Sequence, residues 1–319
     1  DEVNPGVYSD SRFPNCRIVR HRFSFQDRQF MSGARRIPSR FNTVILIDGS
    51  AYWNTSYFSQ AIENAKSMLQ DCDHLTWQFI VMNHPCWPRS NIPSIHRSVQ
   101  KELRDIVSNR EALHIGSLFL LGYSAGANIA IKEAARTDEL ADAFTGIYAV
   151  SPVPDLTSKS IAGIDKTMRD TKARYNHYTR SAKDVRVSET FMDFVKFVVS
   201  SDLSDEFKKC ELTKRQADRV REKLRFILPP KDTERANGDM FMRKHGFSLM
   251  PIPHAKRVWV QGRRDHAAFW VNSKLRKAIL DHMKNELTLN RVSKLGLAQQ
   301  FAQRGVFATS HGSSSSVSV

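Results

Sequence analysis

The chain has 319 residues, of which 41% are hydrophobic and 25% charged, values that are ordinary for a globular protein with a sizeable core. No apolar run reaches the roughly 18 residues that a bilayer-crossing helix requires, so no membrane-spanning helix is expected. The net charge of +15 fits either a role in solubility alone or attraction to an anionic membrane surface or another acidic partner, and no zinc-finger spacing, RNP-like motif or basic heptad region supports specific binding of nucleic acid.

The four cysteines are widely scattered and form no C-x-x-C pair, which favours buried free thiols over a disulfide framework or a metal site: Cys16, Cys72, Cys86 and Cys210. One bridge stays compatible with this spacing. No P-loop, H-E-x-x-H motif or carboxylate-rich cluster is present, so we expect no cofactor and no metal. We expect a soluble chain, with a cytoplasmic location favoured over a secreted one or an excised effector-type domain.

Apolar runs and helical patterns alternate through the first half of the chain. Residues 16–27 alternate as a strand does, and a second short strand near 28–33 would pair with them. Continuous apolar runs then predict strands, and periodic patterns predict the helices between them: strands at 44–47, 77–82, 117–121 and 146–150, and helices at 57–69, 99–107 and 128–135.

The pattern changes between Pro154 and Pro253, where charge-rich helical segments occur without a clear strand. A strand at 257–262, a helix at 273–284 and a short strand at 305–309 follow. The sequence therefore predicts an α/β protein with a mostly parallel central sheet of about eight strands and helices on both faces. The predicted units are the first part of the core, a helical cap and the second part of the core: 1–154, 155–254 and 255–319.

The stretch Gly122-Tyr123-Ser124-Ala125-Gly126 lies where a predicted strand passes into a predicted helix. In this G-x-S-x-G pattern the flanking glycines leave room for the neighbouring strand and helix. The serine is presented at the helix N-terminus, where free N–H groups favour developing negative charge. Residues 122–126 thus predict a nucleophile on a sharp turn.

With this motif in a parallel α/β pattern, residues 40–311 resemble an α/β-hydrolase with its nucleophile on the fifth strand and a cap after the sixth. The resemblance implies an acid after the seventh strand and a histidine after the last one. "GRRD" at 262–265 offers Asp265 as the acid, with Asp155 in "SPVPD" as the alternative. "TSHG" offers His311 as the base. His266 neighbours the proposed acid and is expected to point elsewhere.

The resemblance also implies two backbone donors for an oxyanion. One is the N–H of Ala125, and the other comes from "DGS" and the residue after it, through Ser50 or Ala51. Four aromatic side chains are candidates for lining a substrate pocket: Tyr123, Trp53, His84 and Trp87.

The implied function is a serine hydrolase that cleaves a carboxylic ester through an acyl-enzyme, with an acyl lipid or phospholipid as one candidate substrate. The same catalytic group would serve a thioesterase, an acyltransferase or a peptidase. A further alternative is a non-catalytic binding module of the same fold.

Overall fold

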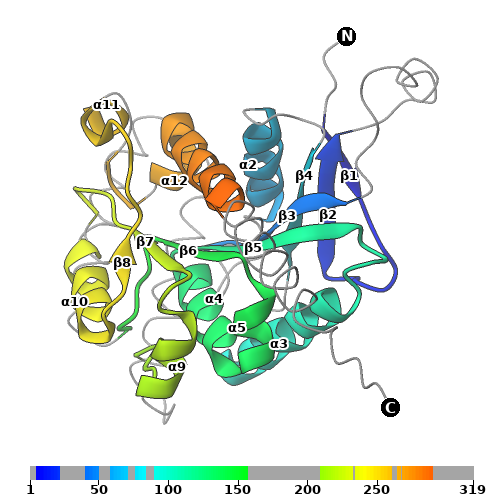
Figure 1. Cartoon of the computed structure of the whole chain (residues 1–319), viewed down its shortest axis with the longest axis horizontal. Helices are drawn as coiled ribbons and strands as arrows, with labels where there is room; N and C mark the ends of the chain where they lie inside the picture. Colours follow the sequence, from blue (N-terminus) through cyan, green and yellow to red (C-terminus); the bar gives the residue numbers. More distant parts are fainter. Residues whose placement is uncertain are drawn as a thin grey trace, which may run out of the picture.

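The computed structural model describes residues 5–21, 40–49, 58–70, 76–83, 90–156, 209–232, 234–260, 264–266 and 268–289. Figure 1 shows these residues arranged around one twisted, open sheet. Within the described residues the sheet has eight strands in the order β1-β2-β4-β3-β5-β6-β7-β8. Their bounds are Pro5–Tyr8 (β1), Cys16–His21 (β2), Phe41–Ile47 (β3), Trp77–Met82 (β4), Ile115–Tyr123 (β5), Gly146–Val150 (β6), Leu224–Ile227 (β7) and Ser248–Leu249 (β8).

Helices connect these strands and cover both faces of the sheet. Their bounds are Phe58–Gln70 (α2), Ile92–Ser108 (α3), Ala125–Arg136 (α4), Asp138–Ala143 (α5), Lys214–Val220 (α9), Arg235–His245 (α10), Ala255–Val260 (α11) and Ala268–Val271 (α12). Residues 273–289 are also helical. In Figure 1, α2 and α12 lie on one face of the sheet, and α3, α4 and α5 lie on the other.

The strand pairing explains why the central runs are apolar throughout. From β4 to β8 every neighbouring pair is parallel, whereas β1–β2 and β2–β4 are antiparallel. All residues of β4 and β6 are buried. A parallel strand with helices on both faces has no solvent side, so both alternating sets of side chains are apolar.

Most of the predicted elements in the first half are confirmed, as is the mostly parallel α/β sheet. The strand predicted at 77–82 has those bounds, and the predicted helix at 57–69 is α2. The strand expected within 16–27 is β2, and it pairs with β1, which the sequence analysis did not predict. The strands predicted at 28–33 and 305–309 lie outside the described residues.

Two predictions for the second half are wrong. The interval 154–253 was expected to carry no strand, but β7 pairs with β6 and β8 pairs with β7, so this part of the predicted cap range 155–254 belongs to the sheet. Residues 257–262 were expected to form a strand, but the helix α11 occupies 255–260. A short apolar run such as "VWV" fits a strand and a helix equally well. Here Val258 is buried and Val260 is 59% exposed, which a strand buried on both faces would not permit.

Within the described part of the chain, no helix is both long and apolar enough to cross a bilayer. The two cysteines in that part, Cys16 and Cys210, are buried free thiols, as expected. Cys72 and Cys86 lie outside the described residues.

Candidate functional site

Ser124 occupies a sharp turn between β5 and α4. Its backbone angles are φ 53° and ψ −123°, a conformation that residues other than glycine rarely adopt. Its N–H donates to the carbonyl oxygen of Val150 at 2.8 Å, which ties the turn to the end of β6. The turn therefore presents the serine side chain at the C-terminal edge of the central parallel strands.

The glycines around Ser124 are required by close packing. A Cβ on Gly126 would collide with the backbone oxygens of Ile47 and Asp48 at the end of β3, and one on Gly122 would lie 2.6 Å from the oxygen of Gly126. Real Cβ atoms do not approach backbone atoms so closely. The two flanking glycines of the motif therefore allow β3, β5 and α4 to meet at the serine, as the sequence predicted.

The histidine beside Ser124 is His266. Its Nε2 lies 2.7 Å from the Ser124 hydroxyl oxygen. Its side chain is 27% exposed, so the ring borders the solvent. The residue lies between α11 and α12, and its own position belongs to neither helix nor strand.

The carboxylate beside His266 belongs to Asp232, whose Oδ1 and Oδ2 lie 3.1 and 3.3 Å from Nδ1. Asp232 follows β7 by a few residues, and its side chain is 1% exposed. Because a carboxylate can only accept, Nδ1 carries a proton and donates it to Asp232. In the neutral ring Nε2 is then the acceptor for the Ser124 hydroxyl.

The charges around the ring stabilise its protonated form. Burial disfavours the imidazolium, but the charge and hydrogen bond of Asp232 outweigh this, and Glu234 and Asp265 add to them, so the pKa of His266 is raised above its usual value. Burial likewise disfavours the Asp232 carboxylate, but the same partnership holds the pKa of Asp232 below its usual value. Glu234, which is also buried, has a raised pKa because of its burial.

Neighbouring groups fix the segment that carries His266. The Tyr123 hydroxyl donates to the His266 carbonyl oxygen at 2.6 Å. The Lys231 N–H donates to the carbonyl oxygen of Arg264 at 3.0 Å, which joins the Asp232 loop to this segment. Further along the chain, Arg276 donates to the carbonyl oxygens of Phe269 and Trp270 in α12 at 3.0 and 2.8 Å.

The structure places residues beside Ser124 other than the partners predicted from the sequence. Its neighbour is His266, which was expected to point elsewhere, whereas the proposed base His311 lies outside the described residues. The carboxylate on His266 is that of Asp232 and not that of the proposed acid, Asp265. Asp265 instead accepts the N–H of Ala268 through its backbone oxygen at 3.0 Å and adds its charge next to the ring.

The sequence did contain a signal for Asp232. The resemblance places the acid after the seventh strand, and Asp232 follows β7 in "LRFILPPKD". The four residues of β7 directly follow a helical pattern and give no separate strand signal. The sequence therefore predicts the seventh strand later, at 257–262. The backbone oxygen of Asp155, the predicted alternative acid, accepts a hydrogen bond from the Asn237 side chain at 3.1 Å.

The other predicted site residues divide into two groups. Ala125 is buried and is the first residue of α4, directly after the serine. Tyr123 is buried, and its hydroxyl is engaged with His266. The remaining candidates lie outside the described residues: Ser50, Ala51, Trp53, His84 and Trp87.

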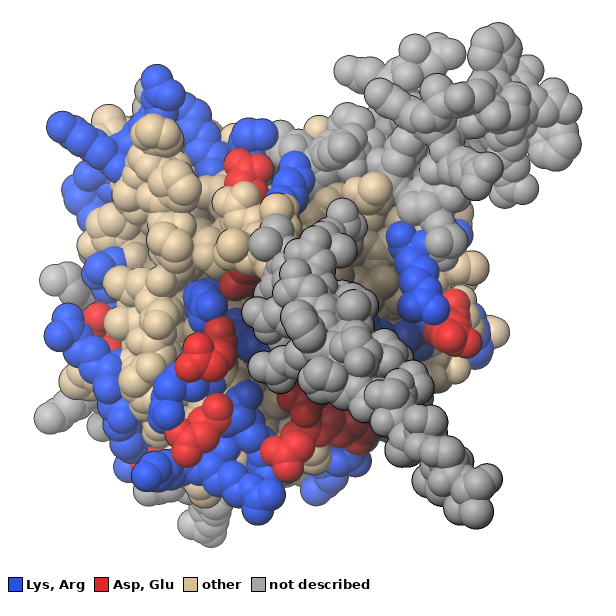
Figure 2. All heavy atoms as spheres, in the orientation of Figure 1, with Lys and Arg blue, Asp and Glu red and all other residues tan. Residues whose placement is uncertain are grey.

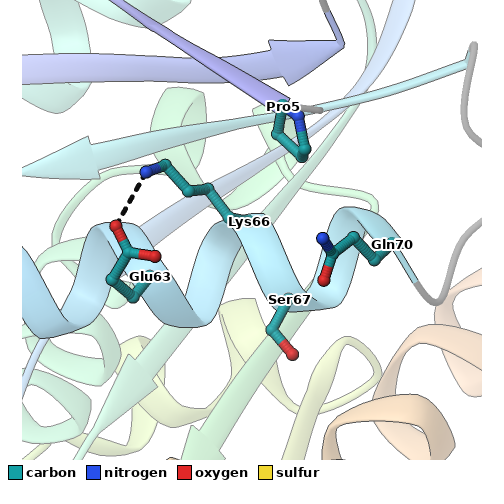
Figure 3. A pocket seen from close by; sticks show the side chains of 5 residues that line it. All are labelled: Pro5, Glu63, Lys66, Ser67 and Gln70. Atoms are coloured by element: carbon teal, nitrogen blue, oxygen red, sulfur yellow. Dashed lines mark hydrogen bonds and ion pairs between the residues drawn. The ribbon is translucent and has the colours of Figure 1, made fainter. Parts of the chain in front are cut away.

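A surface hollow of about 410 Å³ lies elsewhere, on α2 and the start of β1. Figure 3 shows its lining residues, among which Lys66 and Glu63 form an ion pair at 2.7 Å. None of these residues takes part in the Ser124 arrangement. Among the residues that the structure describes, no group of three or more histidine, cysteine or acidic side chains could hold a metal ion.

No protein-family model and no curated protein matches the sequence. Solved structures do match. An inhibited esterase B from Lactobacillus rhamnosis aligns with a TM-score of 0.56 at 14% identity, over 94% of this chain and 90% of the esterase. A hyperthermophilic esterase from the archaeon Pyrobaculum calidifontis aligns with a TM-score of 0.53 at 12% identity, over 87% and 79%. A thermostable esterase from Pseudomonas putida aligns with a TM-score of 0.53 at 11% identity, over 84% and 76%.

Proposed function

We propose that this chain, which has the α/β-hydrolase fold, is a serine hydrolase that cleaves carboxylic esters through Ser124, His266 and Asp232. The observation that carries the proposal is the continuous chain of contacts from the serine oxygen through the imidazole to a buried carboxylate, at 2.7 and 3.1 Å. The esterases that share the fold support the choice of an ester over other acyl compounds.

In the first half of the reaction, the Ser124 oxygen attacks the ester carbonyl carbon while its proton passes to His266 Nε2. The carbonyl oxygen becomes an oxyanion, for which the N–H of Ala125 at the start of α4 is a suitable donor. When the carbon–oxygen bond to the alcohol breaks, His266 returns the proton to the leaving oxygen. The product that stays behind is an ester of Ser124.

In the second half, a water molecule attacks the acyl carbon and gives a proton to His266. The bond to Ser124 then breaks, the serine oxygen recovers the proton, and a carboxylic acid leaves. Asp232 keeps the Nδ1 proton in place throughout and stabilises the imidazolium that forms in each half. The pKa shifts fit this role, since the pKa of His266 is raised and that of Asp232 is lowered.

The proposed substrate is an acyl lipid with an anionic group, such as an anionic phospholipid on a membrane surface. The net charge of +15 supports this choice. In Figure 2 Lys and Arg side chains lie along the edge of the molecule formed by α9, α10 and α11, and the exposed ones include Lys214, Arg243, Lys256 and Arg257. Faster turnover of phosphatidylglycerol than of phosphatidylcholine vesicles would support this choice, and turnover of short soluble esters alone would contradict it.

The test of the central proposal is covalent labelling with a fluorophosphonate, which reacts with activated serines. The wild-type protein should be labelled, and Ser124→Ala should not. The same two proteins are then compared in the hydrolysis of p-nitrophenyl acetate. Failure of the wild type to react in both assays would refute the proposal.

A further inference from the structure

Tyr123 precedes Ser124 directly, so any contact that fixes its side chain also restrains the backbone of the serine. The residue is 4% exposed, and its hydroxyl is the one polar group of the side chain. That hydroxyl donates to the backbone oxygen of His266 at 2.6 Å. A single residue therefore connects the chain segments that carry Ser124 and His266.

The His266 segment needs such an anchor because it has no strand to hold it. In a strand, hydrogen bonds to both neighbours fix the backbone. Residues 264–266 are in neither a strand nor a helix. A backbone hydrogen bond links this segment to the Asp232 loop through Arg264, and the bond from Tyr123 acts two residues further on, at His266 itself.

Ring contacts fix the direction of the Tyr123 side chain. It stacks on Phe269 with ring centroids 5.4 Å apart, and it lies against the rings of His266 and Trp270 at 5.7 Å each. Gly49 also packs closely against the ring, because an added Cβ there would lie 2.6 Å from Cδ1 of Tyr123. The phenol is thus enclosed between the end of β3 and the start of α12, with its hydroxyl directed at His266.

We infer that Tyr123 is a positioning residue that sets the distance between His266 Nε2 and the Ser124 oxygen, a role that rests on the proposed serine hydrolase function. The predicted role of Tyr123 was to line a substrate pocket, whereas its buried hydroxyl is occupied by the backbone of the base. Without this hydrogen bond the His266 backbone loses one of its restraints, so the imidazole, still bonded to Asp232, can shift relative to the serine. Small displacements of this kind slow acyl transfer strongly but leave substrate binding unchanged.

The test is Tyr123→Phe, which removes the hydroxyl and keeps the ring. The matched control is Tyr148→Phe on β6, because the Tyr148 hydroxyl is also engaged, with Glu286 and His282 at 2.8 Å, but is hydrogen-bonded to none of Ser124, His266 and Asp232. Each substitution removes one buried hydroxyl, so we expect both variants to fold with a modest loss of stability. Melting temperatures followed by circular dichroism check this.

For Tyr123→Phe we expect the kcat for p-nitrophenyl acetate and the rate of fluorophosphonate labelling to fall about tenfold, with KM unchanged. Tyr148→Phe should keep both rates while its melting temperature falls by a comparable amount. Wild-type rates in Tyr123→Phe, or equal losses of rate in both variants, would overturn the inference and leave the proposed function standing. An unreactive wild-type protein would instead overturn both.

Discussion

The backbone N–H of Lys231 donates to the carbonyl oxygen of Arg264 across 3.0 Å. Lys231 directly precedes Asp232, and Arg264 lies two residues before His266. This hydrogen bond therefore joins the two loops that carry the carboxylate and the imidazole. It places the two groups together although 34 positions separate them in the sequence.

The identity of the acid can be tested by comparing Asp232→Asn with Asp265→Asn. We expect Asp232→Asn to lower kcat by roughly 10⁴-fold, because an amide at that position no longer holds the imidazole in the reactive tautomer. Asp265→Asn removes a charge that acts on the His266 ring without being hydrogen-bonded to its Nδ1, so its effect on kcat should be far smaller. Hydrolysis of p-nitrophenyl acetate at saturating substrate measures both. A greater loss in Asp265→Asn would restore the assignment made from sequence.

The identity of the base is tested by His266→Ala and His311→Ala. His266→Ala should abolish fluorophosphonate labelling, because no other imidazole among the described residues is hydrogen-bonded to the Ser124 oxygen. His311→Ala should label as the wild type does. Loss of labelling in His311→Ala with retention in His266→Ala would contradict the arrangement described above.

The pH dependence of kcat/KM should follow the titration of His266. The ring must be neutral to accept the serine proton, so activity falls as the pH drops through its pKa. Because that pKa is raised, the fall should occur at a higher pH than for an isolated histidine. Glu234→Gln removes one of the carboxyl groups that raise it, so the acid limb should move to lower pH while the plateau is largely kept. A shift to higher pH in Glu234→Gln would contradict this explanation.

Substitution of Gly126 tests the packing of the serine turn. We expect Gly126→Ala to lower the free energy of unfolding by about 1–3 kcal/mol, because the new methyl group meets the backbone of β3 at Ile47 and Asp48. It should also displace Ser124 and slow labelling. The control is Gly116→Ala on β5, where the nearest atom to an added Cβ is 3.4 Å away, an ordinary contact. Chemical denaturation of both variants gives the comparison, and equal stabilities would show that the turn is not tightly packed.

A buried ion pair should support α4 independently of the reaction. Glu133 is fully buried and accepts from His96 and Arg136 at 2.7 Å, which holds its pKa below the usual value although burial acts to raise it. We expect Glu133→Gln to lower the free energy of unfolding by about 3 kcal/mol, because His96 and Arg136 then lose the buried carboxylate to which they are bonded. The stabilisation is fully present above the pKa of an unfolded glutamate and is lost as the pH falls through the lowered folded value. Urea denaturation across acidic pH measures this.

An exposed pair on α3 provides the control for Glu133. Lys101 and Asp105 lie 2.6 Å apart, but their side chains are 80% and 41% exposed. Asp105→Asn should therefore leave the stability nearly unchanged. Equal effects of the two substitutions would show that burial does not determine the strength of the Glu133 interactions.

The sequence predicted β3, β4, β5 and β6 because these strands are largely buried on both faces, which produces continuous apolar runs. The motif at 122–126 then identified Ser124 from local chemistry alone. The partners of Ser124 come from short elements with weak signals. β7 has four residues, one of them Arg225, and β8 has two exposed residues, so neither produces a periodic pattern long enough to identify.

The error over His266 has a different cause. Adjacent side chains of an extended segment point to opposite sides, so a histidine directly after the proposed acid, Asp265, was expected to point away from it. The segment is instead a turn before α12, where that alternation does not hold. The direction of the imidazole is set by Tyr123 and Asp232, which are distant in sequence, and local patterns carry no information about such contacts.

Because β8 is short, this protein should lose its activity before it loses its folded structure. Ser124 lies at the end of the central strand β5. His266 comes after β8, which is the outermost of the described strands and has two paired residues, Ser248 and Leu249, and after α11, in residues 264–266, which belong to no strand. Edge segments with few backbone hydrogen bonds open before the core does. Inactivation by mild denaturant should therefore precede global unfolding, with rapid amide exchange at the imidazole-bearing segment while β5 stays protected.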